Sequence, residues 1–219
     1  MINKLNLNEQ IYETLKRDIF TNRIENGTLL VNKDLQTRFG VSSSPIRDAI
    51  NRLSQDGLID KITRSGAEVI TLDYDVAREI NELMIIITKG AVELCFKNDN
   101  RAGLINDATE LLKAHKKNLY SNKYFHYDYL FHKLFFDYSK NNKLILLYKQ
   151  FSVVFEMAVR SLDKITLNER HRENSLMQHQ NILDSFIDND FESAKKHITN
   201  HYLSADKVFE KHFKNKKEC

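Results

Sequence analysis

The chain has 219 residues, of which 42% are hydrophobic and 29% charged, with a formal net charge of +3. This length is sufficient for one small and one mid-sized domain, each with a core of its own. The sequence contains no N-terminal apolar run with a cleavage site and no apolar stretch of about eighteen residues, so we expect a cytoplasmic protein without a membrane span. Because 33 basic residues are balanced by 30 acidic ones, any attraction to nucleic acid must come from a local group of cations.

The first predicted element is a short helix before residue 40. Thr28 or Asn32 is placed to cap it, and the apolar Leu35 and Phe39 lie four residues apart on one face. Gly40 can adopt the left-handed conformation that ends a helix. We therefore expect a tight turn directly after this helix.

A second helix is predicted to follow this turn. Ser44 can cap it, and Pro45, the only proline, suits the first helical position because its missing N–H would be unpaired there. The helix carries Arg47 and Arg52 on a polar face and is expected to end at Gly57. Two short helices joined by a glycine turn are typical of a helix-turn-helix.

A hairpin is predicted after this pair of helices. Residues 58–62 and 67–71 are alternating, β-branched runs separated by residues 63–66, with Arg64 near the tip. The hairpin makes the motif a winged helix-turn-helix. Four of the six glycines mark successive element boundaries here: Gly27, Gly40, Gly57 and Gly66.

Beyond about residue 72 the pattern becomes helical throughout, because proline is absent and apolar residues recur at spacings of three and four. We predict six helices, at 75–97, 101–120, 124–139, 142–161, 169–188 and 190–213. The short polar connections between them indicate an antiparallel bundle. The predicted fold is therefore mainly α, with a winged helix-turn-helix domain at 1–72 and an all-α helical bundle at 73–219.

All eight histidines lie in the predicted bundle. Asp128 and His132 are four residues apart on one helical face, and His179 and His201 belong to two further helices. Together they could form a nitrogen and oxygen site for zinc, nickel, manganese or iron. A simpler interpretation stays open, because helical histidines are often ordinary core or surface residues and an Asp-x-x-x-His pair is often a local ion pair.

The pattern from Tyr12 through Val69, including Gly40-Val41-Ser42 and Pro45-Ile46-Arg47-Asp48-Ala49-Ile50, resembles the amino-terminal domain of GntR-type bacterial transcription regulators. The rest of the chain is similar to the helical ligand domain of the FadR branch, the FCD domain, in its VanR-like six-helix form. The resemblance implies a DNA-binding transcription regulator rather than an enzyme. It further implies a homodimer that binds a palindromic operator and responds to a small-molecule effector.

The resemblance also implies a metal site. Many FCD domains hold a divalent ion through an Asp-x-x-x-His pair and two later histidines, which match Asp128, His132, His179 and His201 here. Zinc is the first expectation, with nickel, manganese or iron as alternatives. His197 is the substitute for His201 if the register differs. The remaining histidines are expected to be solvated: His115, His126, His171 and His212.

The DNA contacts divide by position. Lys33, Arg38 and the wing tip are expected at phosphates or in the minor groove, and Arg47 at a base edge. Arg52 is expected to pair along its own helix with Asp48 or Asp56. Ser43 stands where this family usually has an arginine, so base recognition must depend on other residues. The predicted DNA-binding set is Lys33, Ser42, Ser43, Ser44, Arg47, Arg64 and Gly66.

The predicted effector site also departs from the family pattern. Met84 and Thr88 occupy the positions where the family often has an arginine for the effector's carboxylate and a glutamate. Recognition of a carboxylate-bearing effector is therefore expected from the metal together with a further cation, with Arg160, Arg170 and Arg172 as candidates and Arg160 and Arg172 as the predicted site residues. For Arg170 and Arg172 the alternative of a solvated charge near a loop stays open.

Two other functions remain as alternatives. The ion itself could be the signal, which would make the protein a direct metal sensor. A helical-bundle metalloenzyme with a nucleic-acid module is also conceivable, but neither a His-Glu-x-x-His motif nor a Glu-x-x-His pair occurs.

Overall fold

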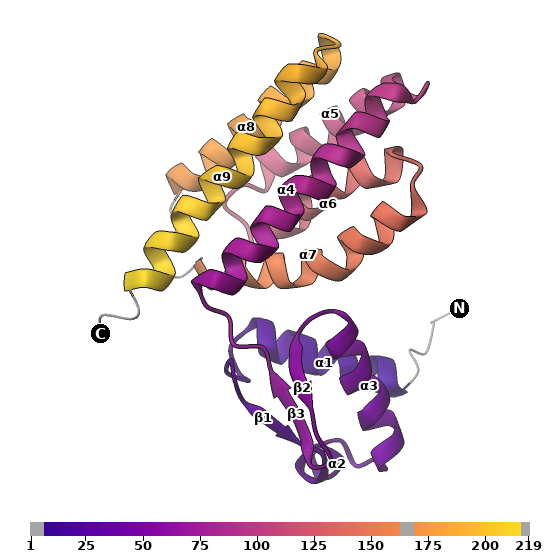
Figure 1. Cartoon of the computed structure of the whole chain (residues 1–219), viewed down its shortest axis with the longest axis vertical. Coiled ribbons are helices and arrows are strands. Elements are labelled where there is room, and N and C mark those ends of the chain that lie inside the picture. Colours follow the sequence, from indigo (N-terminus) through magenta and orange to yellow (C-terminus); the bar gives the residue numbers. More distant parts are fainter. Residues whose placement is uncertain (1–6, 163–168, 216–219) are drawn as a thin grey trace. The chain divides into compact units, whose positions relative to one another are not determined.

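The computed structural model describes residues 7–162 and 169–215 (Figure 1). The chain forms two compact units, one ending at Asp73 and the other beginning at Tyr74. They are called the N-terminal and C-terminal units below.

The N-terminal unit contains three helices and a small antiparallel sheet. In chain order its elements are α1 (Leu7–Phe20), β1 (Leu29–Val31), α2 (Asn32–Phe39), α3 (Ser43–Gln55), β2 (Ile59–Ile62) and β3 (Gly66–Val69). The strand order is β1-β3-β2, and α1 packs against α3. Fully buried side chains from these helices, including Leu15, Ile46 and Leu53, form the core. The predicted winged helix-turn-helix is confirmed.

The sequence pattern predicts neither α1 nor β1. The strand β1 has only three residues, which is too short to show an alternating pattern, and it is held by pairing with β3. The register places Leu30 opposite Ala67, so segments nearly 40 residues apart in sequence are joined. Only tertiary pairing defines this strand.

The predicted cap of α2 is wrong. Asn32 is the first residue of this helix, and the N-cap position belongs to Val31, which makes no side-chain capping bond. Thr28 lies before β1 and cannot cap the helix. The prediction fails because it does not include the strand. Gly40 does end α2 in the left-handed conformation, with φ of 65°.

The start of α3 also differs from the prediction. Ser42 is the N-cap and makes no side-chain capping bond, so Ser44 and Pro45 both lie inside the first turn. A proline is tolerated there because the amides of a first turn have no partner within the helix. The helix therefore begins two residues earlier than expected.

Gly66 lies at a predicted element boundary, but it does not adopt the left-handed conformation. A Cβ at this position would overlap the carbonyl oxygen of Leu30, because β1 and β3 approach closely there. Of the four glycines predicted at element boundaries, three adopt the left-handed conformation: Gly27, Gly40 and Gly57.

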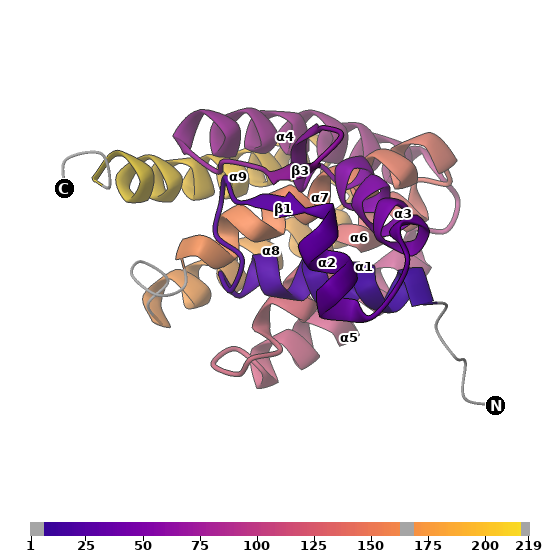
Figure 2. The same ribbon diagram turned by 90° about the horizontal axis from the view of Figure 1, so that it is seen from below.

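The C-terminal unit is helical. Its elements are α4 (Tyr74–Lys97), α5 (Arg101–Lys117), α6 (Tyr124–Tyr138), α7 (Asn142–Leu162), α8 (Glu169–Ile187) and α9 (Phe191–Asn215). The six predicted helices are confirmed to within a few residues. α4 lies beside α9, which in turn packs on α8 (Figure 1, Figure 2). Among the described residues, none of these helices is long and apolar enough to cross a membrane.

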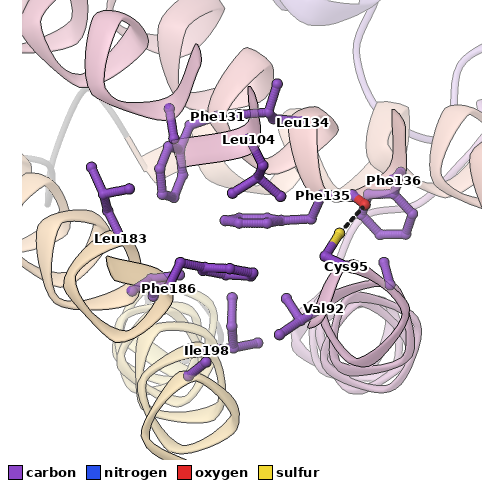
Figure 3. Packing of buried hydrophobic residues seen from close by; sticks show 14 of the residues in the cluster. Val92, Cys95, Leu104, Phe131, Leu134, Phe135, Phe136, Leu183, Phe186 and Ile198 are labelled. Atoms are coloured by element: carbon purple, nitrogen blue, oxygen red, sulfur yellow. Dashed lines mark hydrogen bonds between the residues drawn. The ribbon is translucent and has the colours of Figure 1, made fainter. Parts of the chain in front are cut away.

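Aromatic residues of α6 fill the core of this unit. Phe131 and Phe135 are buried, and the ring of Phe135 stacks on Phe186 of α8 with centroids 5.6 Å apart. On the other side of the core, the thiol of Cys95 donates a hydrogen bond to the Phe135 carbonyl at 3.1 Å (Figure 3). These contacts fix α6 against α4 and α8, and therefore also fix the side chains next to the phenylalanines.

Replacing Gly66 with alanine is expected to destabilise the N-terminal unit by about 1–3 kcal/mol, because the new methyl group forces β1 away from β3. Urea denaturation of the full chain measures the effect. Gly90→Ala is the control, since its added Cβ meets no atom within 4 Å beyond its chain neighbours and the backbone of its own helix, and alanine favours a helix more than glycine. Equal stability of the two variants would contradict the proposed close approach.

Candidate metal centre and nucleic-acid interface

Three histidines from three helices converge inside the C-terminal unit. The Nε2 atom of His132 on α6 lies 3.2 Å from Nε2 of His179 on α8 and 3.1 Å from Nε2 of His201 on α9. All three side chains are buried, and their ligand nitrogens lie within 4.8 Å of one another. The structure thus brings together the three histidines that the sequence singles out.

The spacing of these nitrogens fits a metal ion. With metal–nitrogen bonds of about 2.0–2.1 Å, adjacent nitrogens around a tetrahedral or octahedral ion lie about 2.9–3.4 Å apart. The two separations from His132 Nε2, 3.2 and 3.1 Å, fall inside this range. His132 Nε2 faces the Nε2 atoms of both His179 and His201. A shared cation can bind all three nitrogens, whereas a single N–H proton pairs with them less completely.

Asp128 adds a carboxylate beside the histidines. It lies one helical turn before His132, and its Oδ1 is 3.7 Å from His179 Nε2. Burial, reinforced by the charge of Glu156, raises the pKa of Asp128 to about 7. A divalent ion would favour the ionised carboxylate, so Asp128 is suited to be the fourth ligand.

Hydrogen bonds outside the cluster orient two of the rings. His201 Nδ1 lies 2.9 Å from Gln178 Oε1, which can only accept, so Nδ1 carries the proton and Nε2 keeps its lone pair. Gln178 in turn donates to Ser204 at 2.9 Å. The Tyr202 hydroxyl lies 3.4 Å from His132 Nδ1. Such outer contacts are typical of metal-binding histidines.

Burial keeps the three rings neutral. It lowers the pKa of His201 to about 4 and the pKa values of His132 and His179 well below the ordinary histidine value. A neutral imidazole is the form that binds a metal, so no proton has to leave these rings near pH 7.

The structure corrects three assignments among the other histidines. His197 bonds to Ser185 and to the Asn181 carbonyl, so it is not the substitute ligand. His115 and His212, which the sequence places in solvent, are buried. Their helices bury more of their surface than the sequence pattern indicates.

A cavity of about 350 Å³ adjoins the histidine cluster, and both Asp128 and His201 line it. Apolar side chains such as Phe155, Val159 and Phe209 form much of its wall. Its volume lies within the range of small-molecule sites, about 300–1,000 Å³.

The predicted effector-binding arginines do not line this cavity. Arg160 pairs with Glu156 at 2.7 Å and lies over the ring of Phe125. Arg172 donates to the Leu119 carbonyl at 3.0 Å and so ties α8 to the end of α5. Both guanidinium groups make contacts that the sequence did not reveal, and their role towards an effector stays a prediction.

Three of the predicted DNA-binding residues line a hollow between α3 and the β2–β3 hairpin. Arg47 from α3 and Arg64 from the hairpin tip both line it, and both are exposed. Gly66 also lines it, although it is buried in the sheet. Lys33 is exposed, as are Ser42 and Ser44, while Ser43 is half-buried.

Three polar residues absent from the predicted set also line the hollow: Asn32, Asn51 and Thr63. Asn51 lies four residues after Arg47, so the helical period could have indicated that both share one face. No sequence pattern indicated Asn32, because its position beside the hollow depends on the pairing of β1 with β3.

Two arginines of this unit stabilise the fold instead. Arg38 pairs with the buried Asp18 of α1. Arg52 pairs with Glu9 of α1 and lies over the Tyr12 ring at 3.9 Å, not beside the acidic residues of its own helix. The expected pairing of Arg52 along its own helix is therefore wrong, because the sequence pattern does not predict α1. The expected phosphate contact of Arg38 stays a prediction, since its side chain is 43% exposed.

A winged helix-turn-helix joined to a helical domain with a ligand-sized cavity defines a class of DNA-binding regulators. Residues 7–69 match the family described as "Bacterial regulatory proteins, gntR family", and residues 79–204 match the FCD domain. The chain therefore belongs to the gntR family and is a DNA-binding transcription regulator with an FCD domain.

Similar proteins agree with this assignment. The uncharacterized HTH-type transcriptional regulator YdhC of Bacillus subtilis is 28% identical over 196 residues, covering 88% of this chain and 86% of YdhC. The gluconate operon transcriptional repressor of the same organism is 23% identical over 175 residues, covering 78% and 71%. Among solved structures, McbR/YncC of E. coli has a TM-score of 0.77 at 17% identity, covering 95% of this chain and 99% of that one. That similarity shows the fold alone.

Asp128→Asn is expected to stabilise the metal-free protein at pH 8. The folded-state pKa of about 7 lies above the ordinary aspartate value, so the contribution of Asp128 to stability is present at low pH and lost as pH rises through 7. The gain should reach roughly 2–4 kcal/mol at pH 8 and shrink towards pH 5. Urea denaturation in the presence of a chelator measures it.

The control is Asp99→Asn, which changes an exposed carboxylate between α4 and α5. It should leave stability unchanged at both pH values. If Asp128→Asn is no more stable than the wild type at pH 8, burial does not destabilise the ionised carboxylate of Asp128.

Proposed function

We propose that this regulator carries a divalent metal ion, zinc in the first place, held by Asp128, His132, His179 and His201. A small, carboxylate-bearing metabolite binds at that ion from the adjoining cavity and modulates operator affinity. The observation that carries the proposal is the convergence of three imidazole nitrogens from three helices at a cavity that Asp128 and His201 also line. This role requires the protein to share the cytoplasm with its operator.

The chemistry of the cavity supports an anionic effector. The ion would supply positive charge at one wall of a mainly apolar space, where a carboxylate is only weakly screened by water. His132, His179 and His201 belong to α6, α8 and α9, so occupancy of the site bears on how three helices pack. An effector that prefers one packing biases operator affinity, typically by about 1–3 kcal/mol in allosteric proteins.

The DNA-binding role follows from the geometry of the N-terminal unit. We assign Arg47 to a base edge and Lys33 and the Arg64–Gly66 wing tip to phosphates or the minor groove, because recognition helices enter the major groove while flanking elements follow the backbone. Ser42, Ser43 and Ser44 at the start of α3 supply further hydroxyl contacts. A homodimer on a palindromic operator supplies the binding surface that one small module lacks.

Purified protein is expected to hold about one divalent ion per chain and to lose it when His132 and His179 are both replaced by alanine. The same variant should lose the thermal shift that a carboxylate effector produces in a screen of sugar acids, dicarboxylates and amino acids. His126→Ala, which removes an exposed histidine, is the control. Elemental analysis and thermal-shift measurements report the two effects.

A metal-free wild type with an unchanged effector response would overturn the proposal. DNA binding that follows free metal concentration in a chelator titration would instead indicate a direct metal sensor. A tightly held ion that does not exchange during the titration supports the effector-binding role.

Arg47→Ala is expected to weaken operator binding by about 1–3 kcal/mol and to relax sequence preference, because it removes a base contact. Lys33→Ala should weaken binding to all sequences similarly and flatten the salt dependence. Titrations of operator and random DNA at several salt concentrations separate the two. Lys117→Ala in the C-terminal unit is the control, and equal losses for both test variants on both DNAs would contradict the assignment.

A further inference from the structure

His115 on α5 is a buried histidine without a visible partner. Its side chain is fully buried, and neither ring nitrogen has a hydrogen-bond partner among the residues that the structure describes. The same is true of Nδ1 of His179 on α8. Buried polar atoms are rarely left unpaired in native proteins, so these nitrogens require an explanation.

The two rings lie side by side. Their centroids are 5.6 Å apart, with 38° between the ring planes. Phe131 stacks on His179 with centroids 4.3 Å apart, which limits the movement of that ring. Because Nε2 of His179 points to the histidine cluster, Nδ1 is the nitrogen left for a contact outside it.

The other two histidines of the cluster already have outer contacts. His201 uses Nδ1 to bond Gln178, and His132 Nδ1 lies near the Tyr202 hydroxyl. Metal-binding histidines almost always donate their second N–H to an acceptor, which fixes the tautomer and the ring orientation. Only His179 among the three lacks such an acceptor in the described part of the chain.

We propose that His115 is the outer partner of His179, accepting its Nδ1–H directly after a small ring rotation or through one bridging water. His115 is thereby a positioning residue, which holds His179 Nε2 towards the centre without touching the ion. The inference rests on the proposed metal site. It also makes α5 a fourth helix that is coupled to the site.

His115 has the chemistry that this role needs. A neutral imidazole keeps one nitrogen with a lone pair and can accept a hydrogen bond there. Burial lowers the pKa of His115 to about 4, so the ring is neutral near pH 7. The nearby ring of Tyr124, with its centroid 5.0 Å away, packs against His115 and restricts its position.

The test compares two substitutions at this position. His115→Phe keeps an aromatic ring but removes the acceptor, and His115→Gln supplies an amide oxygen in its place. Zinc affinity, measured by competition with a chelator, should fall about 10- to 100-fold in His115→Phe and recover substantially in His115→Gln. His126→Phe, at an exposed histidine, should bind zinc as the wild type does.

A second measurement does not depend on the metal. Nitrogen-15 NMR of the metal-free wild type should show His179 as a single tautomer protonated at Nδ1, and His115→Phe should convert it to a mixture. A mixture of His179 tautomers in the metal-free wild type would overturn the inference. This outcome can be observed even if His115→Phe does not fold.

The outcomes separate this inference from the proposed function. Wild-type zinc binding together with unchanged affinity in His115→Phe would overturn the role of His115 alone. A wild type that binds no zinc would overturn the proposed metal site, while the tautomer of His179 would still decide whether His115 is its partner.

Discussion

The C-terminal unit depends on one constraint, which is that three imidazole rings are buried together. Burying a polar group without a partner is costly, and here the Nε2 atoms of His132, His179 and His201 face mainly one another. A shared cation, as proposed above, would remove this cost and at the same time link α6, α8 and α9. In that proposal, the interaction that stabilises the bundle is also the one through which a ligand acts on it.

The aromatic core makes this arrangement possible. Phe131 lies next to His132 on α6 and stacks on His179, while Phe135 stacks on Phe186. These contacts hold α6 and α8 in register, which keeps His132 close to His179. A packed core of this kind changes between discrete arrangements rather than deforming continuously, as a switch requires.

The N-terminal unit separates its cations by role. α1 supplies Asp18, which holds Arg38, while Arg47 and Arg64 make no ion pair with any described residue and line the hollow beside the recognition helix. Cations held within the fold contribute to stability, and those left at the surface supply the local field that attracts DNA. A nearly neutral chain can therefore still present a basic surface where it needs one.

The sequence by itself determined every helix except α1, and the hairpin, because helical periodicity and glycine turns are local properties. The identity of the clustered histidines was indicated by the family resemblance, since their spacing alone left a simpler interpretation open. The sequence did not determine β1, the caps of α2 and α3, or the burial of His115, since each depends on a segment distant in the chain. The same holds for Arg160 and Arg172, whose partners became evident only when the helices were packed. Only the tertiary structure could decide these points, because a side chain's partner is set by which elements meet in space.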